Sequence, residues 1–348
     1  MTRTIDFRYH VIRNGATFCE LHAVEGAEPR ILMDDGSAIK TKLSGSFLLP
    51  DEEVNWLTDE IQPVMIINGV EHSLGVFLPA NVSETETDTA RRVSVDSFDR
   101  GWIVKDYRTE RMLFFLSGTA YIDAISSILA ECGITLISAV PSAETLAEDR
   151  ADWEIGTPAL DIVNQLLAEI NYEELWFDQG GAAVLEPKAT PTANNIEHTL
   201  DEESVESLML PGIQKSTDFH NSPNVFICIC SNADKDSAMV AIAENTNPQS
   251  PLSLARRGRR IPVLVNVDNI ASQEELQLYA DRMVTDSLLK GEVINVTTCL
   301  LPDYGVGDIV ALHYGELTAI CKAKRWNMDL KVGGRMSFTL ERVILNLD

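Results

Sequence analysis

Two cysteines stand closest to a metal-binding arrangement in this sequence. Cys228 and Cys230 lie two residues apart in a run that predicts a β-strand, so their thiols should lie on the same face. A structural zinc site needs four ligands, and none of the six histidines stands at ligand spacing from this pair. We therefore favour two small apolar side chains in a core over a zinc site.

The segment Asn232 to Asp236 resembles the first half of a calcium-binding loop, because Asn232, Asp234 and Asp236 place oxygen ligands at alternate positions. The sixth position of such a loop needs glycine, and the twelfth needs a bidentate glutamate. This sequence has Ser237 and Ala243 there. A polar turn between two strands is the favoured interpretation.

Two further groups have a chemical and a structural interpretation. Asp123 and Asp161 stand at matching places in two similar helical segments. They could form a pair of catalytic acids, but a carboxylate in the first turn of a helix is stabilised there by free N–H groups. Trp153, Trp176 and Phe177 could form a sugar-binding surface, although an aromatic core is favoured.

The cluster Arg256 to Arg260 holds four guanidinium groups in five residues. Such groups repel one another and need anionic partners. One interpretation is pairing with carboxylates at an interface between domains or subunits. The other is contact with phosphate, which would make this a loop that touches DNA.

No catalytic, cofactor-binding or metal-binding residues are predicted. The sequence has no nucleophile elbow, paired zinc-binding histidines, phosphate-binding loop or dinucleotide fingerprint. The net charge of −25 argues against general affinity for nucleic acid or anionic membranes. The sequence shows no apolar run long enough to span a membrane and no signal peptide, and its six scattered cysteines predict free thiols in a reducing cytoplasm.

Residues 1–110 predict a first β-domain. Asn68-Gly69 between two apolar runs is typical of a tight hairpin, because both residues accept the positive φ of a type I′ turn. Residues 188–348 predict a second β-domain with one helix near 272–290, where Ser272 to Glu275 would form a capping box and Gly291 would end the helix. The run Asn224 to Cys230 is apolar on both faces, so we expect a buried strand.

Residues 111–187 predict a small α/β module with a repeated helix. Gly118 to Gly133 has one apolar helical face, and a similar segment starts 38 residues later, at Gly156. Thr119 and Thr157 are the expected N-caps. The expected fold class is α+β and mainly β, with two related antiparallel β-barrels and this module inserted between them.

This layout resembles the central hub proteins of phage tails, which include contractile-baseplate hubs and the N-terminal hub region of siphophage tail-associated lysins. The resemblance is carried by Trp153 to Asp178 with Gly180-Gly181, by the earlier copy Gly118 to Gly133, and by Pro302 to Val310 and Gly333 to Arg342. The resemblance extends over most of the chain in the order of its elements. It assigns no functional residues to this sequence.

The resemblance implies a homotrimer in the virion, at the tail tip or baseplate, assembled in the cytoplasm of a bacterial host. Three subunits with two barrels each would match a sixfold tail tube or distal tail protein above. A spike, fibre or lysin would bind below, with a tape-measure protein as a further partner. Since the last barrel strand falls at the end of the chain, we expect a hub that is not an enzyme.

Two alternatives stay open. The Gly-Thr-led helices followed by strands and Trp176 resemble LysM modules, which would make the chain a virion-associated component that binds or degrades cell wall. The other alternative is that the chain is a housekeeping oligomeric scaffold with no role in a phage. For a hub, the acidity predicts carboxylates on the inner wall of the ring, where they would repel DNA and let it pass without specific binding.

Overall fold

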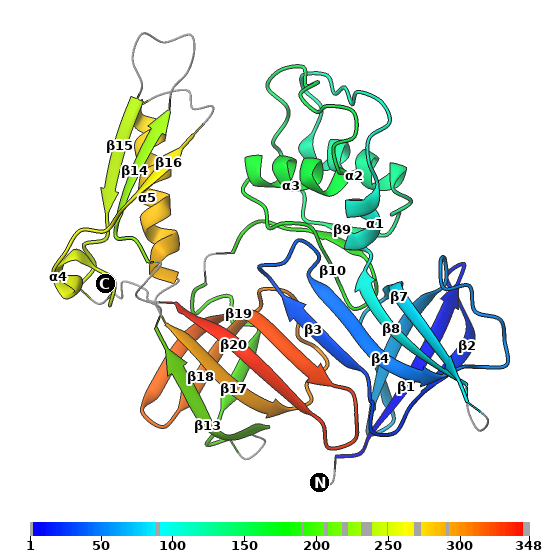
Figure 1. Ribbon diagram of the computed structural model, residues 1–348. Helices are drawn as coiled ribbons and strands as arrows, with labels where there is room; N and C mark the ends of the chain where they lie inside the picture. The colour runs from blue at the N-terminus through cyan, green and yellow to red at the C-terminus, as the bar shows by residue number, and fades with distance from the viewer. Residues whose placement is uncertain are drawn as a thin grey trace. The chain divides into compact units, whose positions relative to one another are not determined.

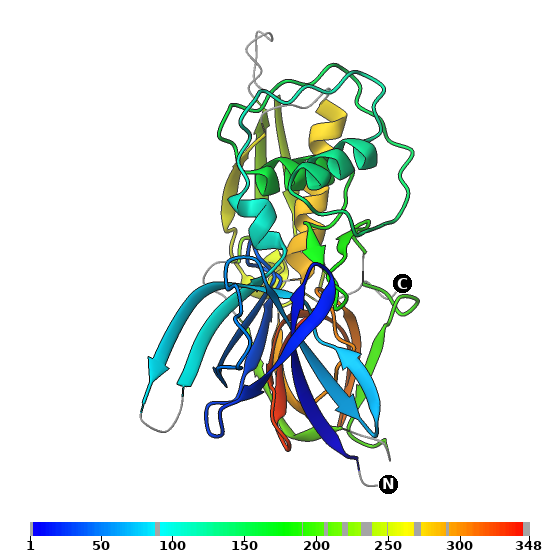
Figure 2. The ribbon, with the colours of Figure 1, turned by 90° about the vertical axis from the view of Figure 1, so that its right-hand side faces the viewer.

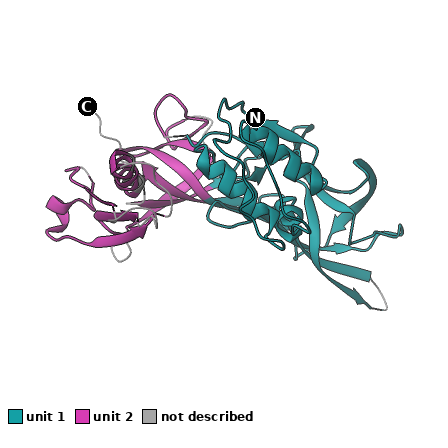
Figure 3. Cartoon of the chain, turned by 90° about the horizontal axis from the view of Figure 1, so that it is seen from above, with its two compact units in different colours: residues 1–190, 298–306, 325–337 teal, residues 191–297, 307–324, 338–348 magenta. Residues whose placement is uncertain are grey.

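The structure, a computed structural model, describes residues 3–87, 91–189, 191–204, 208–217, 222–230, 239–248, 250–267, 273–289 and 292–343. They fall into two compact units (Figure 3). Unit 1 comprises residues 1–190, 298–306 and 325–337, and unit 2 comprises residues 191–297, 307–324 and 338–348. No helix in these ranges is long and apolar enough to cross a membrane.

Six strands of unit 1 close into an antiparallel barrel (Figure 1). In spatial order they are β1 (Ile5–Arg13), β2 (Ala16–Ala23), β4 (Thr41–Leu48), β8 (Arg91–Asp99), β7 (Phe77–Glu86) and β5 (Glu60–Ile67). The ring closes because β5 pairs with β1 over eight residue pairs. Alternate residues point inward, and Phe47, Phe77 and Met65 are fully buried among them.

Two shorter strands flank the barrel. β3 (Arg30–Asp34) pairs with β4, and β6 (Val70–Ser73) pairs with β5. The β5–β6 turn has φ of 52° at Asn68 and 85° at Gly69, which confirms the predicted type I′ hairpin. β7 and β8 form a long hairpin, drawn in cyan in Figure 2.

The repeated helices form a module with its own core in unit 1. Its elements are α1 (Gly101–Asp106), α2 (Tyr121–Glu131), β9 (Ile137–Ala139), α3 (Ala159–Glu169), β10 (Trp176–Phe177) and β11 (Ala183–Leu185). The three strands form a small sheet in the order β10-β11-β9. Leu166, Leu167 and Ile125 are buried between the helices. The sequence did not predict α1, whose Val104 joins this core.

The two copies of the repeat hold each other in place. Thr109, which leads into the first copy, exchanges backbone hydrogen bonds with Thr157 and Gly156 at the start of α3. Leu146, which leads into the second copy, does the same with Thr119 and Gly118 at the start of α2. Each segment therefore satisfies donors and acceptors at the start of the other copy's helix.

The ends of the two helices differ in part from the prediction. Neither Thr119 nor Thr157 is the N-cap, because the helices start later, at Tyr121 and Ala159, without a side-chain cap. The Thr157 hydroxyl instead donates to the Glu154 carbonyl oxygen at 2.7 Å. Gly133, with φ of 83°, takes the left-handed conformation after α2, and Asn171, with φ of 58°, takes it after α3.

Unit 2 contains a β-sheet domain and a smaller α/β subdomain. The domain follows the order β13 (Met209–Ser216), β17 (Val293–Cys299), β20 (Arg335–Val343), β19 (Leu317–Asp329), β18 (Ile309–Tyr314) and β12 (His198–Asp201). The ends of β17, β19 and β20 belong to unit 1. Together with the closed barrel of unit 1, this mainly β, antiparallel architecture confirms the predicted fold class.

The smaller subdomain has a separate three-stranded sheet that the sequence did not distinguish. Its order is β15 (Met239–Glu244), β14 (Val225–Cys230) and β16 (Pro262–Asn266), followed in the chain by α5 (Gln273–Leu289). The short helix α4 (Leu254–Arg257) precedes β16. The predicted capping residue Ser272 and the terminal Gly291 lie outside the described residues.

One arginine ties the module of unit 1 to the barrel. Arg100 follows β8, and its Nε and Nη2 both donate to the Glu60 carboxylate of β5 at 2.7 Å. Its Nη1 donates to the Gly181 carbonyl oxygen between β10 and β11 at 2.9 Å. Hydrogen bonds to Glu60 raise the pKa of Arg100 above its usual value. A planar guanidinium is the side chain that can make this forked contact and a third bond.

We expect Arg100→Ala to lower the free energy of unfolding by about 2–4 kcal/mol, because it leaves the half-buried Glu60 carboxylate without its cation. The matched control is Arg8→Ala, which removes an exposed pair with Glu71 and should cost less than about 1 kcal/mol. Urea titration of both variants measures the difference. Equal losses would contradict the role given to Arg100.

Asp59 makes a second forked pair and predicts a pH dependence. Its carboxylate accepts from Arg13 Nε at 2.9 Å, from Arg13 Nη2 at 2.7 Å and from the Asn55 N–H at 2.8 Å. The Arg13 hydrogen bonds hold the pKa of Asp59 below its usual 3.8. Because the folded pKa is the lower one, this stabilisation is present above pH 3.8 and is lost as the pH falls through the folded pKa.

Asp59→Asn should therefore be less stable than the wild type at pH 7, and the two should converge below pH 3.8. Thermal unfolding followed by circular dichroism between pH 7 and pH 2.5 checks this. A difference that stays constant across that range would show that the charge of Asp59 contributes nothing.

Candidate functional site

The candidate metal and acid residues that the structure describes do not form a metal-binding cluster. In the ranges that the structure covers, no group of three or more His, Cys, Asp or Glu residues could hold a metal ion. Cys228 and Cys230 share one face of β14, as expected, and are buried in an apolar cluster with Leu276 and Ala280. Burial raises the pKa of Cys228. The calcium-like segment Asn232 to Asp236 lies outside the described residues.

Asp123 and Asp161 occupy equivalent places in the first turns of α2 and α3. Both side chains are exposed. Each is positioned to interact favourably with the free N–H groups of its own helix. This arrangement agrees with the structural interpretation of the two carboxylates.

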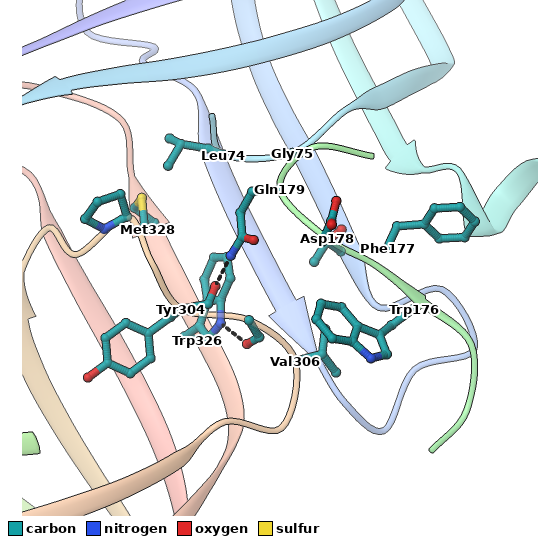
Figure 4. A pocket seen from close by; sticks show the side chains of 13 residues that line it. Leu74, Gly75, Trp176, Phe177, Asp178, Gln179, Tyr304, Val306, Trp326 and Met328 are labelled. Carbon is teal, nitrogen blue, oxygen red and sulfur yellow. Dashed lines mark hydrogen bonds between the residues drawn. The ribbon is translucent and has the colours of Figure 1, made fainter. Parts of the chain in front are cut away.

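The three aromatic residues do not form a common surface. Trp153 is buried in the module, where its ring meets that of Phe115 at 6.0 Å and its Nε1 donates to Gln165 at 2.9 Å. Phe177 is 5% exposed in the same core. Trp176 is half-buried and lines a cavity of unit 1 (Figure 4).

This cavity lies where the module meets strands of the barrel and the segment around Tyr304. Its accessible space is about 20 Å³, which is room for one water molecule. The residues labelled around it come from three parts of unit 1: Leu74 and Gly75, Trp176 to Gln179, and Tyr304, Val306, Trp326 and Met328 (Figure 4).

The polar groups around the cavity already have protein partners. Gln179 Nε2 donates to the Tyr304 carbonyl oxygen at 3.1 Å, and Trp326 Nε1 donates to the Gly305 carbonyl oxygen at 3.0 Å. The Trp176 Nε1 donates to Glu186 at 3.1 Å. Sugar recognition requires polar groups that can bond to the ligand, so this geometry fits packing at a junction better than a sugar site.

The module also carries a row of exposed apolar side chains, which we call the apolar stripe: Met112, Phe114 and Leu116. Their exposed fractions are 61%, 56% and 60%. The residues between them, Leu113 and Phe115, point into the module core. This alternation is that of an extended segment with one buried face.

The internal repeat supplies a natural comparison for the stripe. The positions 38 residues later hold Arg150, Asp152 and Glu154, with Trp153 buried where the first copy has Phe115. Asp152 and Glu154 are exposed, whereas the Arg150 side chain is only 13% exposed and pairs with Asp152 and Glu169. The second copy therefore shows that these positions accept charged residues. Apolar residues at the same positions of the first copy are typical of a surface that meets another molecule. The stripe was not predicted from the sequence, although its signal lies in the comparison of the two repeats.

The arginine cluster of Arg256 to Arg260 has local partners within unit 2. Ser253 caps α4 by accepting from the Arg256 N–H, and Arg256 Nε donates to the Pro248 carbonyl oxygen at 3.0 Å. Arg257 donates to the Ser222 carbonyl oxygen, and Arg260 pairs with Glu244. The side chains of Arg256, Arg259 and Arg260 are exposed. An interface and a phosphate contact both stay predictions for this cluster.

No protein-family model matches the sequence, and no curated protein matches it significantly. Solved structures do. A tail protein from Neisseria meningitidis MC58 is 14% identical with a TM-score of 0.67, and the match covers 96% of each chain. The 43 kDa tail protein of prophage MuSo2 from Shewanella oneidensis is 11% identical with a TM-score of 0.69, over 97% of this chain and 98% of that one.

A third match is the c3393 protein of E. coli, a component of the type VI secretion system with structural similarity to the T4 bacteriophage tail proteins gp27 and gp5. It is 9% identical with a TM-score of 0.54, over 97% of this chain and 77% of that one. These matches agree with the resemblance found in the sequence. The chain has the fold of these phage tail proteins.

Proposed function

We propose that this chain is a structural hub protein of a phage or phage-like tail. Three copies form a ring that closes the tail tube and lets DNA pass, and the chain has no catalytic role. The observation that carries this proposal is the likeness to tail proteins over 96% or more of both chains, barrel and module included. The function is thus proposed for the whole architecture rather than for one domain.

The barrel arrangement supports a trimer. Each chain contributes one closed six-stranded barrel and one further six-stranded sheet. Three chains arranged by a threefold axis would present six such units, which matches a sixfold tube above and a threefold spike, fibre or lysin below. Head-to-tail contacts that close after a fixed number of copies produce rings of this kind.

The acidic composition supports passage of DNA. The formal charge of one chain is −25. Carboxylates on the inner wall of a ring would repel the phosphates of DNA, so the DNA would pass through without binding to the wall. The proposed location is the virion, at the tail tip or baseplate, after assembly in the host cytoplasm. Tail-tube, tape-measure and distal proteins are the proposed partners.

Sedimentation equilibrium at micromolar concentration tests the proposal, with an expected mass of three times 38.5 kDa. Electron microscopy of the same sample should show a threefold ring with a negatively charged lumen. A monomer in solution and no ring in the particle would refute the trimer. Retention on purified peptidoglycan would instead favour the wall-binding alternative.

The apolar stripe allows a sharper test of assembly. The triple change Met112→Arg, Phe114→Asp and Leu116→Glu copies the residues of the second repeat onto the first. Because these side chains are already exposed, the free energy of unfolding should change by less than about 0.5 kcal/mol per site. Loss of apolar contact area should weaken assembly at least about tenfold.

The matched control makes the same types of change at scattered exposed apolar residues. Val70→Arg, Val332→Asp and Leu57→Glu alter side chains that are 59%, 74% and 86% exposed. This control should assemble like the wild type. If both triple variants shift the sedimentation profile equally, the stripe has no specific role.

A further inference from the structure

The three-stranded sheet of unit 2 is covered by a helix on one face. Cys228, Cys230, Ala241 and Ala243 point toward α5, where they form one cluster with Leu276 and Ala280. The helix is also anchored by two glutamines, since Gln273 Nε2 donates to the Val240 carbonyl oxygen at 2.8 Å and Gln277 Nε2 to that of Ile242 at 3.2 Å. These bonds also satisfy two acceptors on the outer edge of β15.

The opposite face of the same sheet is also largely apolar, with the polar residues Glu244 and Asn266 at the ends of its outer strands. Because side chains alternate along a strand, it presents the residues between those that meet α5. These are Ile227 and Ile229 of β14, Val240 and Ile242 of β15, and Leu264 of β16. In the register of the sheet, Ile227 stands opposite both Ile242 and Leu264. The exposed fractions of Val240, Ile242 and Leu264 are 47%, 49% and 59%. We call these five residues the open face.

The strand pattern indicates that the open face should be covered. β14 pairs in parallel with β16 and antiparallel with β15, so this sheet is mixed. A central strand that is apolar on both sides is typical of a sheet with both faces covered, and helices are the usual cover of such faces in α/β folds. Here α5 supplies one cover, and the second is missing from the described part of the chain.

Charge indicates the chemistry of that second helix. The Asn224 Nδ2 donates to the Arg259 carbonyl oxygen at 3.0 Å, and its Oδ1 accepts from the Ile261 N–H at 2.7 Å. These bonds place the arginine cluster beside the starts of β14 and β16. At this end of the sheet Arg260 pairs with Glu244 of β15, and the side chains of Arg256, Arg259 and Arg260 are exposed. The arginines outnumber this one carboxylate, so carboxylates at the same end of a helix lying on the open face would be favoured.

None of the helices in the described part of the chain supplies the second cover. Among the described helices, α2 and α3 already bury their apolar faces in the module core, and α5 buries its own against the sheet. The remaining helices, α1 and α4, have six and four residues. Two copies set face to face with their strands running in the same direction would also bring one arginine cluster against the other, which costs free energy by repulsion.

We propose that the open face binds an amphipathic helix of another protein, with acidic residues at the end that meets Arg256 to Arg260. This goes beyond the proposed hub function, because it assigns a surface and the chemistry of a partner segment. The contact does not require the ring, so either proposal can fail without the other.

A synthetic helix is the probe. β14 has six residues and spans about 20 Å, which a helix of about 13 residues matches. A fluorescent peptide of roughly that length, bridged between side chains one turn apart to hold the helix, would carry leucines on one face and glutamates in its first turn. Titration with the full-length protein should give saturable binding by fluorescence anisotropy.

Variants of the open face should remove this binding. Leu264→Asp and Ile242→Asp should each weaken it at least about tenfold, because a carboxylate would be buried against leucines. The matched control is Leu278→Asp, on the solvent side of α5, where the exposed fraction of 63% is close to that of Leu264. Leu264→Ser is the milder second variant, and circular dichroism verifies folding of each.

The arginines allow a separate test of the electrostatic part of the proposal. A peptide with lysines in place of the glutamates should bind at least about tenfold more weakly, and Arg259→Glu combined with Arg260→Glu should reverse that preference. The proposal is overturned if the peptide does not bind, if both peptides bind alike, or if Leu278→Asp weakens binding as much as Leu264→Asp. A lower oligomer mass for Leu264→Asp without peptide would also overturn it, because a second copy would then occupy the face.

Discussion

The forked contact of Arg100 joins the parts of unit 1, and the rest of that unit depends on it. The closed barrel and the helical module have separate cores, so contacts between them must fix their orientation, such as the ring contact of Phe98 with Trp102 and the polar contacts of Arg100. Arg100 follows β8 directly, bonds to Glu60 of the neighbouring part of the barrel, and reaches the Gly181 carbonyl between β10 and β11. Lys40 of the barrel adds a pair with Glu174 of the module at 2.6 Å. The cavity beside Trp176 is what packing leaves at such a junction.

Local patterns predicted the elements that depend on local physics. Asn68-Gly69 specified its turn because few other residues accept positive φ, and the apolar face starting at Gly118 specified a helix because its period is 3.6. The helix caps were wrong at Thr119 and Thr157, because the starts of α2 and α3 are held by Leu146 and Thr109 from the other copy. No local pattern shows such an exchange.

Residues that act across long separations were missed for the same reason. Arg100 is one arginine among many in the sequence, and only its meeting with Glu60 and Gly181 gives it a role. The segment after it, Gly101 to Asp106, contains Trp102, Ile103 and Val104 and is as compatible with a strand as with the helix it forms. The run Asn224 to Cys230 was correctly predicted as a strand that is apolar on both faces, but periodicity could not show that only one face is covered.

Local charge rather than net charge decides what this chain can bind. With 53 acidic and 28 basic residues, its net negative charge repels acidic partners as well as DNA. An acidic helix would therefore be rejected over most of the protein and attracted only beside the four arginines, where apolar contact is also offered. Repulsion elsewhere then contributes to specificity as much as attraction at the cluster does. A basic partner would have many more places to bind, so an arginine cluster on this acidic protein selects one position more sharply than an acidic cluster would.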